Sequence, residues 1–429
     1  MKTFKKIDSL KGEITVPPDK SVTHRAFLLS LMAEGVSYVT NPLLSRDTLS
    51  TLSAVEMLGG EVTKNENSFK IKSPGFICFK EPSNIIDCGN SGTTARLITG
   101  VLAPQGKFFV LTGDDSLKKR PMDRVIAPLS RMGAKIYGRQ DNRLLPLAVT
   151  PARMFPADIK AAVKSAQVKS AVLFAAAQIN GESSYMETTP TRNHSEIMLR
   201  QFGCDLTVDN NIITVKGGKK LLPSEVRVPG DFSSSAFFLS AVLMFENSEI
   251  AIKNVGLNKT RTGLLDVMKS FGVKFNVDLR NSDTGEPFGD ISIKSQNVQG
   301  GKISGDIIAN VIDEIPAIAA LGLFAEKPVE IRDAGELRVK ESDRISALVC
   351  NLRSLGADVE EFDDGLKIYP LESVNMKAEL KSFGDHRIAM VNILLSKRFG
   401  NLPIDDIACV DVSFPEFLRN IEKLEVTSC

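Results

Sequence analysis

The segment Leu58-Gly59-Gly60-Glu61-Val62 has the form of a helix end, a glycine and the start of a strand. Glycine suits the left-handed conformation that closes many helices, and the residues after it alternate as a strand does. The same phrase returns at intervals of roughly 70 to 85 residues. The further copies are Met132-Gly133-Ala134-Lys135-Ile136, Phe202-Gly203-Cys204-Asp205-Leu206, Phe271-Gly272-Val273-Lys274-Phe275 and Leu355-Gly356-Ala357-Asp358-Val359. This recurrence favours a fold built from one repeated unit.

A second phrase, strand then turn then apolar helix, precedes the first. Ile14-Thr15-Val16-Pro17-Pro18-Asp19 leads into Ala26–Met32, and Val226-Arg227-Val228-Pro229-Gly230-Asp231 leads into Ala236–Met244. All βα units look somewhat alike, but two phrases in the same order favour genuine repetition. The period exceeds that of typical solenoids, so each unit is expected to be a βαβαββ subdomain. The tail Ala378–Leu424 has room for a shortened sixth copy, which gives two similar α/β domains of three units each.

The composition is that of an ordinary globular protein without a strong overall charge. The chain has 429 residues, 43% hydrophobic and 24% charged, enough for two or three domains. A formal net charge of +1 gives no global field to recruit nucleic acid or an anionic membrane. With no Trp and four Tyr, stacking platforms for single strands are few. Any attraction for anions must therefore be local.

The start of the chain lacks the apolar core of a signal peptide, and no apolar run approaches the roughly 18 residues of a membrane span. We therefore expect a cytoplasmic protein. The six cysteines are scattered, with no C-x-x-C pair and no histidine at zinc-ligand spacing. Reduced thiols, mostly buried as small hydrophobes, are expected, and a metal site is not.

Each of the three histidines stands in a polar cluster with an arginine, just before an expected helix. The clusters are Lys20-Ser21-Val22-Thr23-His24-Arg25, Thr191-Arg192-Asn193-His194-Ser195-Glu196 and Gly384-Asp385-His386-Arg387, and the expected helices are Ala26–Met32, Ile197–Phe202 and Ile388–Leu395. Polar residues at a helix start are often simple caps. Free helix N–H groups beside Lys or Arg also bind anions, and the repetition favours that interpretation.

The segment Asp87-Cys88-Gly89-Asn90-Ser91-Gly92-Thr93-Thr94-Ala95-Arg96 enters another expected helix through a Gly-rich turn. The lysine of a phosphate loop is absent, so an ATP site is disfavoured. Glycine lets a ligand approach the backbone closely, and the flanking hydroxyls and arginine favour a binding turn over a plain connection. Ser165-Ala166-Gln167-Val168-Lys169-Ser170 likewise opens a helix that ends in Ala171–Ala177.

Three further segments are rich in charge. Gly113–Met122 places basic residues after two aspartates, and Leu337–Arg344 is dense in both signs of charge. Taken by itself, the pattern of Leu337–Arg344 favours a solvated, salt-bridged helix face. Asp313-Glu314-Ile315-Pro316 places two carboxylates before an apolar helix, where capping is the simplest interpretation.

Together these segments resemble the 5-enolpyruvylshikimate-3-phosphate (EPSP) synthase family of enolpyruvyl transferases, from Val16 to Pro415. The most specific pieces are Asp19-Lys20-Ser21-x-x-His24-Arg25, Gly89-Asn90-Ser91-Gly92-Thr93, Arg120-Pro121-Met122, Arg338-Val339-Lys340-Glu341-Ser342-Asp343-Arg344 and Asp385-His386-Arg387. One alone is a weak signal, and all of them in order are a strong one.

The resemblance implies an α/β (α+β) fold of two similar domains, each of three βαβαββ repeats in an inside-out α/β barrel, with an active-site cleft between them. The implied domains are 1–19 plus 230–429, which holds both termini, and the inserted 20–229, with hinges near 19–20 and 228–230. No cofactor and no metal are implied. The implied partners are two small-molecule substrates, phosphoenolpyruvate and shikimate-3-phosphate, acted on by a monomer.

These substrates together carry roughly five negative charges, so several Lys and Arg must converge on them. The residues implied for shikimate-3-phosphate are Lys20, Ser21, Arg25 (carboxylate), Ser165 and Arg192 (phosphate), Ala166, Gln167, Asp313 and Lys340. Those implied for phosphoenolpyruvate are Lys20, Arg120 and Gln167 (phosphate), Arg344 and Arg387 (carboxylate), and Asn90, Gly92 and Thr93 (wall).

The resemblance also implies a mechanism of addition followed by elimination. The methylene carbon of phosphoenolpyruvate gains a proton, the shikimate 5-hydroxyl attacks, and phosphate leaves. The implied catalytic residues are Asp313, which takes the hydroxyl proton, and Lys20 with Glu341, which manage the carbon proton. Glyphosate occupies the phosphoenolpyruvate site in this family, and Gly92 aligns with a wall glycine that is alanine in tolerant members.

The chain departs from the common family pattern in three places. Pro17-Pro18-Asp19 replaces Pro-Gly-Asp, and Ala166 replaces a second serine, which removes one phosphate contact. Asp411-Val412-Ser413-Phe414-Pro415 lacks the lysine that many members carry before this phrase. Arg192 and Lys169 are expected to compensate in part. These features indicate a subclass of the family.

Two rival functions fit parts of the same sequence. The sister transferase acting on UDP-N-acetylglucosamine has Lys-Asn in place of Lys20-Ser21 and a catalytic cysteine in the region of Arg120, so it is disfavoured. A non-catalytic repeat scaffold predicts Arg and Lys spread over the surface, and leaves the carboxylates Asp313, Glu341 and Asp385 unexplained. Phosphate release from phosphoenolpyruvate with shikimate-3-phosphate separates these alternatives.

Overall fold

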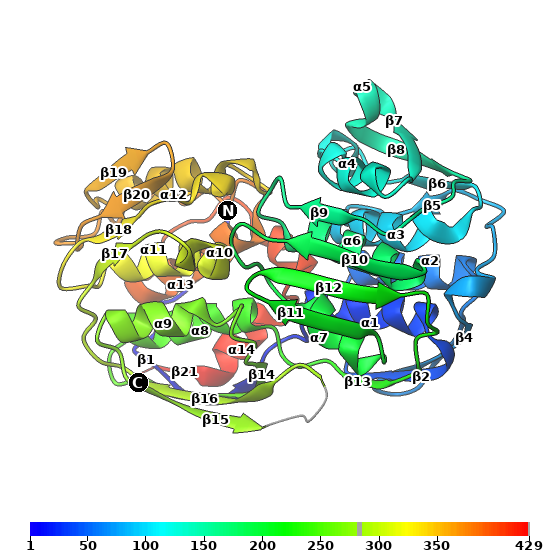
Figure 1. The fold of residues 1–429 in the computed structure, drawn as a ribbon. Coiled ribbons are helices and arrows are strands. Elements are labelled where there is room, and N and C mark those ends of the chain that lie inside the picture. The colour runs from blue at the N-terminus through cyan, green and yellow to red at the C-terminus, as the bar shows by residue number, and fades with distance from the viewer. Residues whose placement is uncertain (281–284, 428–429) are drawn as a thin grey trace. The chain divides into compact units, whose positions relative to one another are not determined.

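The computed structural model describes residues 1–280 and 285–427, and it divides into two compact units (Figure 1). Unit 1 comprises Met1–Pro17, residues 230–280 and residues 287–427. Unit 2 comprises Pro18–Pro229 and residues 285–286. Asp19 N donates to Pro229 O at 2.8 Å and Asp231 N donates to Pro17 O at 2.8 Å, so the two chain crossings run side by side.

Unit 2 contains three repeats of one βαβαββ pattern. The first consists of β13 (Glu225–Arg227), α1 (Lys20–Met32), β2 (Glu34–Thr40), α2 (Arg46–Met57), β3 (Glu61–Lys64) and β4 (Ser68–Pro74). The second consists of β5 (Ile86–Asp87), α3 (Gly92–Leu102), β6 (Phe109–Thr112), α4 (Asp123–Arg131), β7 (Lys135–Gly138), the short α5 (Arg139–Asn142) and β8 (Leu144–Thr150). The third consists of β9 (Asp158–Lys160), α6 (Ala166–Gln178), β10 (Gly181–Met186), α7 (His194–Gln201), β11 (Asp205–Asp209) and β12 (Ile212–Gly217).

Unit 1 repeats the pattern. Its first copy consists of β1 (Ser9–Thr15), α8 (Phe232–Met244), β14 (Glu249–Gly256), α9 (Gly263–Ser270), β15 (Phe275–Arg280) and β16 (Phe288–Lys294). Its second consists of β17 (Gly301–Ile303), α10 (Ile307–Val311), α11 (Ile315–Gly322), β18 (Val329–Ile331), α12 (Arg344–Ser354), β19 (Val359–Phe362) and β20 (Gly365–Ile368). In all five of these repeats the first two strands pair in parallel, and the last two form an antiparallel hairpin beside the second.

A reduced sixth copy completes unit 1, as the sequence predicts. It keeps α13 (His386–Phe399) and α14 (Phe417–Leu424), while β21 (Glu425–Val426) pairs with β1. Its own strands are reduced to single bridges, parallel between Leu380 and Ile404 and antiparallel between Ile404 and Lys2. Lys2 therefore stands where the other copies have their last strand.

The glycines of the recurring phrase behave as predicted. Gly59, Gly133, Gly203, Gly272 and Gly356 all have positive φ, between 79° and 106°. Each follows a helix end and turns the chain into the next strand, a conformation that a residue with a Cβ adopts only with strain. The left-handed glycine is the local reason why each repeat turns at the same place.

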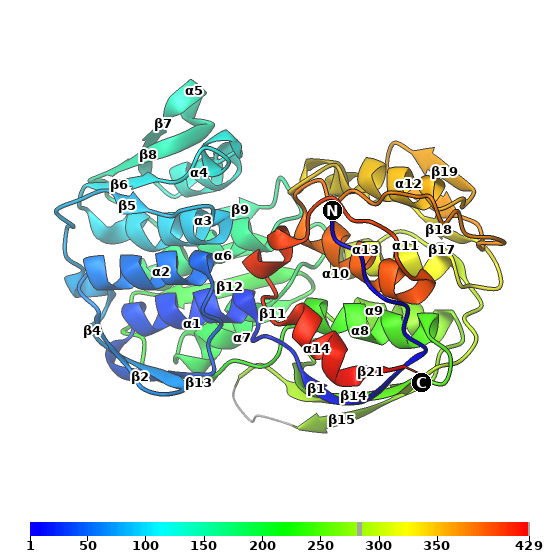
Figure 2. The same ribbon diagram turned by 180° about the vertical axis from the view of Figure 1, so that it is seen from behind.

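One helix from each repeat lies in the interior of its unit, with side chains buried on every face. In unit 2 these are α1, α3 and α6, and in unit 1 they are α8, α11 and α13. Every residue of α8 is buried, and α8 contains the apolar helix expected at Ala236–Met244. Figure 1 shows the sheet β11-β12-β10-β9 beside α6, and Figure 2 shows unit 1 from behind with α13 among its helices. Two hydrophobic clusters result, one in each unit.

The expectation for the cysteines is only partly right. The five that lie in the described part of the chain are free thiols, as expected. They are not mostly buried, however: Cys88 is buried, Cys204 and Cys409 are half-buried, and Cys78 and Cys350 are exposed. Cys429 lies outside the described residues. Within the described residues, no helix is long and apolar enough to cross a membrane.

Candidate active site

The N-termini of the three interior helices of unit 2 meet, and they carry most of the residues predicted for the substrates. Gln167 in the first turn of α6 donates through Nε2 to Thr93 Oγ1 in the first turn of α3, at 2.9 Å. Arg25 of α1 donates to Ser170 Oγ of α6 at 2.7 Å. Because helix N-termini present free N–H groups and a partial positive charge, three of them together favour an anion.

Side-chain caps fix these helix starts. Asp19 accepts from Val22 N at 2.9 Å, Ser91 accepts from Thr94 N at 3.0 Å, and Ser165 accepts from Val168 N at 3.4 Å. Each of these three residues therefore caps its helix. Caps and anion binding are compatible, because a cap uses only one of the free N–H groups of the first turn.

A wall of amide and guanidinium groups surrounds the Gly92 turn. Arg120 donates through Nη2 to Asn90 Oδ1 at 2.7 Å, and Asn90 in turn donates to Asp114 Oδ2 at 2.6 Å. Arg96 donates through Nη1 to Gln167 Oε1 at 2.7 Å. A Cβ added to Gly92 would lie 2.8 Å from Arg96 Nη1 and 3.5 Å from Arg120 Nη1. Gly92 therefore faces two arginine head groups at once.

Lys20 and Arg25 occupy different environments on α1. Lys20 is half-buried and pairs with Asp47 at 3.2 Å. Arg25 is buried, and its guanidinium donates to Ser195 Oγ at 2.7 Å, Ser21 O at 2.9 Å and Ser170 Oγ at 2.7 Å. Burial lowers the pKa of Arg25 to about 10, so it stays charged at neutral pH.

In unit 2, the other residues predicted for shikimate-3-phosphate lie at the start of α6 and in the loop before α7, whereas Asp313 and Lys340 lie in unit 1. Ser165, Ala166, Gln167 and Arg192 are all half-buried. Lys169 was expected to help with phosphate, and this expectation is wrong. Its side chain is 0% exposed and pairs with Glu187 at 2.9 Å and Glu196 at 2.6 Å. Burial raises the pKa of Glu196 in this cluster.

Unit 1 presents a second convergence of helix N-termini, here rich in carboxylates. Arg344 at the start of α12 is 1% exposed and donates to Asp385 Oδ2 at 2.7 Å, Glu341 Oε2 at 2.7 Å and Asp313 Oδ1 at 3.4 Å. Arg387 on α13 donates to Asp313 O at 2.7 Å. Burial favours a higher pKa for Glu341, but Arg344 and His386 outweigh it and bring the pKa to about 2. Glu341 is therefore ionised.

The interpretation of Leu337–Arg344 as a solvated, salt-bridged face is wrong for Arg344 and right for its neighbours. Arg338 pairs with Asp343 at 2.9 Å and Glu361 at 3.1 Å, and Lys340 pairs with Glu336 at 3.2 Å. The capping interpretation of Asp313 and Glu314 also fails, because α11 has no side-chain cap. Asp313 instead faces the two arginines described above.

Several residues of these clusters escaped the sequence analysis. Asp47, the partner of Lys20, lies on α2 of the same repeat, 27 residues further along the chain, and has no local signal. Arg96 was noted in its motif without a role, although it stands four residues after Gly92 and so lies on the same helix face. The buried partners of Arg25, Ser170 and Ser195, are distant in sequence and only the fold brings them together.

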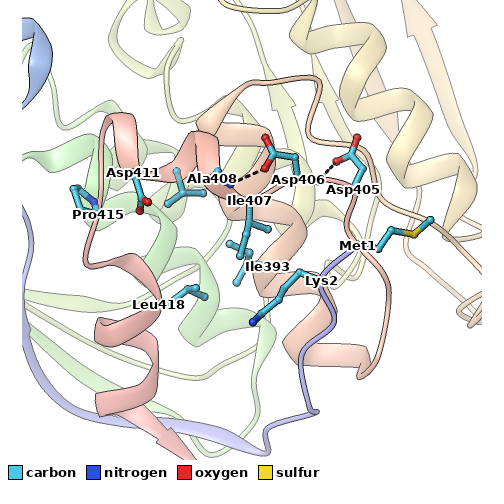
Figure 3. A pocket seen from close by; sticks show the side chains of 11 residues that line it. Met1, Lys2, Ile393, Asp405, Asp406, Ile407, Ala408, Asp411, Pro415 and Leu418 are labelled. Atoms are coloured by element: carbon cyan, nitrogen blue, oxygen red, sulfur yellow. Dashed lines mark hydrogen bonds between the residues drawn. The ribbon is translucent and has the colours of Figure 1, made fainter.

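A cavity of about 360 Å³ lies elsewhere, in the sixth copy of unit 1 (Figure 3). Its lining includes Met1, Lys2 and three aspartates, Asp405, Asp406 and Asp411. Asp405 and Asp406 accept from backbone N–H groups of Ser382 and Ala408, both at 2.8 Å. A lining so rich in aspartate is unsuited to anionic substrates. Among the described residues, no group of His, Cys, Asp and Glu side chains is arranged to hold a metal ion.

Comparisons with solved structures place this fold among the two-domain enolpyruvyl transferases. The structure matches EPSP synthase from Acinetobacter baumannii with a TM-score of 0.90 and 36% identity, covering 99% of this chain and 98% of that one. It matches the enolpyruvyl transferase NikO from Streptomyces tendae with a TM-score of 0.77, covering 99% and 98%; at 14% identity this supports the fold alone.

Sequence comparison identifies the family. The EPSP synthase (3-phosphoshikimate 1-carboxyvinyltransferase) family model matches residues 4–421. Proteins named 3-phosphoshikimate 1-carboxyvinyltransferase match at 43% identity from Pelobacter propionicus, over 97% of this chain and 96% of that one, and at 41% from Bacillus subtilis, over 99% of each. The chain belongs to this family, whose enzymes transfer the enolpyruvyl group of the shikimate pathway. The family and function predicted from the motifs are confirmed.

Proposed function

We propose that this chain carries out that transfer, from phosphoenolpyruvate to the 5-hydroxyl of shikimate-3-phosphate with release of phosphate, using the two clusters of helix N-termini. The convergence of α1, α3 and α6 carries the proposal. It offers Lys20, Arg25, Arg96 and Arg120 beside free helix N–H groups, which suits substrates with roughly five negative charges between them.

Shikimate-3-phosphate binds mainly to unit 2 in this proposal. Arg25 holds its carboxylate, with Lys20 and Ser21 nearby, while Ser165 and Arg192 hold its phosphate beside Ala166 and Gln167. Asp313 and Lys340 of unit 1 complete the proposed set. The support is the charge of Arg25, retained despite burial, and its rigid anchoring by Ser170 and Ser195.

Phosphoenolpyruvate binds to residues of both units. Lys20, Arg120 and Gln167 take its phosphate along the wall of Asn90, Gly92 and Thr93, and Arg344 and Arg387 take its carboxylate. Arg344 already meets three carboxylates, so the substrate carboxylate takes the place of one of them. A guanidinium can bind a carboxylate through two parallel N–H groups, which gives this exchange its geometry.

Asp313 accepts the proton of the 5-hydroxyl as that oxygen attacks, and Arg344 at its carboxylate and Arg387 at its carbonyl hold it in place for this role. Lys20 donates the proton to the methylene carbon. Glu341, which is ionised with a pKa of about 2, lies beside Arg344 and manages the carbon proton together with Lys20. Residues of two units act on one reaction, so the domains 1–19 plus 230–429 and 20–229 close on the substrates about hinges near 19–20 and 228–230. Because one chain supplies every residue named, the protein works as a monomer in this proposal. Its proposed location is the cytoplasm, as expected from the sequence.

The test is phosphate release by the purified chain. Phosphoenolpyruvate with shikimate-3-phosphate should release inorganic phosphate, whereas phosphoenolpyruvate with UDP-N-acetylglucosamine, or either substrate alone, should not. Release with the sugar nucleotide would favour the sister reaction. No release with any acceptor would favour the non-catalytic scaffold.

A further inference from the structure

Lys169 is a buried lysine whose three N–H groups are all taken by the protein. It lies in the second turn of α6, where Nζ contacts Glu187 Oε2 at 2.9 Å, Glu196 Oε1 at 2.6 Å and Thr191 O at 3.2 Å. An ammonium group has three donors, so these acceptors leave none for a substrate. A buried lysine with this much partnering acts on the structure around it.

Glu187 also holds the loop between β10 and α7 through its other carboxylate oxygen. Its Oε1 accepts from Thr191 N at 3.1 Å and also from the Thr191 hydroxyl. Thr191 is therefore held through its N–H, its hydroxyl and its carbonyl by the Lys169–Glu187 pair. The next residue is Arg192, so the loop between β10 and α7 is fixed beside this arginine.

The pair also fixes the loop relative to the start of α6. Lys169 N donates to Ser165 O at 3.1 Å, so Lys169 stands one helical turn after Ser165. Ser165 and Arg192 are the two residues proposed for the phosphate of shikimate-3-phosphate. The contacts of Lys169 and Glu187 link α6 to Thr191, and this link sets the distance between the Ser165 hydroxyl and the Arg192 guanidinium.

We propose that Lys169 and Glu187, acting through Thr191, are positioning residues that hold Arg192 toward the phosphate of shikimate-3-phosphate. The inference rests on the proposed function of Arg192. It also accounts for Ala166: where a second serine is missing, a guanidinium held in one orientation supplies a bidentate, charge-assisted contact instead. A loosely held arginine would lose conformational entropy on binding and contribute less.

The experiment uses Thr191, because removing Lys169 would leave two buried carboxylates and endanger folding. Thr191→Val deletes the hydroxyl at nearly constant volume. Its KM for shikimate-3-phosphate should rise about tenfold, the effect of a lost hydrogen bond to a charged group, while kcat and the KM for phosphoenolpyruvate stay unchanged. Thr191→Ser, which keeps the hydroxyl, should restore the KM. Thr207→Val, on the exposed face of β11, is the matched control and should change nothing.

A double-mutant cycle with Arg192→Ala shows whether the effect passes through the arginine. Thr191→Val should add nothing to the KM of the Arg192→Ala variant, because the positioned group is gone. If the two effects multiply, or if Thr191→Val lowers only the melting temperature, the positioning role is overturned while the role of Arg192 stands. If Arg192→Ala leaves the KM for shikimate-3-phosphate unchanged, the proposed phosphate contact itself is wrong, and the inference falls with it.

Discussion

Asp313 meets one arginine through its carboxylate and another through its carbonyl, which fixes it at the start of α11. We expect Asp313→Ala to leave both substrates bound and to lower kcat by about 10²–10⁴-fold, since a general base is removed. Steady-state kinetics with calorimetric binding of each substrate check this. Asp209→Ala, an exposed carboxylate on β11, is the control. An Asp313→Ala variant with most of its activity would reduce Asp313 to a partner of the arginines.

Gly92 has no room for a side chain without moving an arginine. Because an added methyl would lie 2.8 Å from Arg96 Nη1, Gly92→Ala should displace that guanidinium and intrude on the wall of the phosphoenolpyruvate site. Glyphosate, longer than the substrate, should lose more affinity than phosphoenolpyruvate does. Competitive inhibition of the wild type and the variant measures this. The control is Gly335→Ala, whose Cβ would come no closer than 3.9 Å to its neighbours. Equal inhibition of parent and variant would mean that Gly92 does not line the pocket.

His24 gives the protein a predictable response to acid. It is fully buried with Nδ1 2.7 Å from Thr51 Oγ1, and burial, aided by Lys20 and Arg25, lowers its pKa well below 6.5. The unfolded chain takes up a proton as pH falls through about 6.5 and the native state does not, so acidification favours unfolding. The contribution of His24 to the free energy of unfolding should be fully present above about pH 7. Below pH 6.5 this contribution should fall by up to about 1.4 kcal/mol per pH unit.

Urea denaturation at pH 7.5 and pH 5.5 tests the prediction. His24→Gln should show a smaller difference in midpoint between the two pH values than the wild type, even if its stability at pH 7.5 is lower. The same difference in both proteins would assign the acid sensitivity to other groups.

Helices α3 and α6 approach so closely at Gly100 that their backbones touch. A Cβ on Gly100 would lie 2.1 Å from Ala171 O, and backbone cannot yield as a side-chain tip does. Gly100→Ala should therefore cost about 1–3 kcal/mol of stability and separate Thr93 from Gln167, raising the KM for phosphoenolpyruvate. The melting temperature should fall and the KM for phosphoenolpyruvate should rise in Gly100→Ala. Both changes should be larger in Gly100→Val, which has the bulkier side chain. Unchanged values would mean that the helices stand further apart.

At the scale of elements, the sequence predicted the presence of helices better than their starts and their partners. Helix α1 begins at Lys20, α7 at His194 and α13 at His386, so much of each polar cluster lies in the first turns of its helix instead of preceding it. The glycine phrases and the polar clusters before Ala26, Ile197 and Ile388 depend on local conformation and capping, which neighbouring residues determine. The burial of Arg344 and Lys169 depends on carboxylates from other repeats or from beyond the next strand. A charged run on an exposed helix and one at a meeting of helix ends have the same composition, so only the fold distinguishes them.

At the scale of the whole molecule, each unit holds only part of the proposed residue set. Phosphoenolpyruvate is expected to bind poorly until shikimate-3-phosphate is present, because the first ligand lowers the free energy of closure for the second. Calorimetric titration with each ligand alone and then together tests this. Equal affinity for phosphoenolpyruvate with and without shikimate-3-phosphate would contradict it.

The pairing of β1 with β14 has a consequence for biosynthesis. β1 leaves the ribosome before β14, and the segment Pro18–Pro229, nearly all of unit 2, is translated between β1 and its parallel neighbour β14 at Glu249–Gly256. At elongation rates of about 5–20 residues per second this is a wait of roughly 10 to 50 s, during which β1 of the nascent chain lacks its parallel partner. Unit 2 can acquire its fold in that interval, since its last strand, β13, is made before α8. The order of synthesis therefore favours an order of folding. Unit 2 can fold first, and unit 1 folds later, when β14 has been made and can pair with β1.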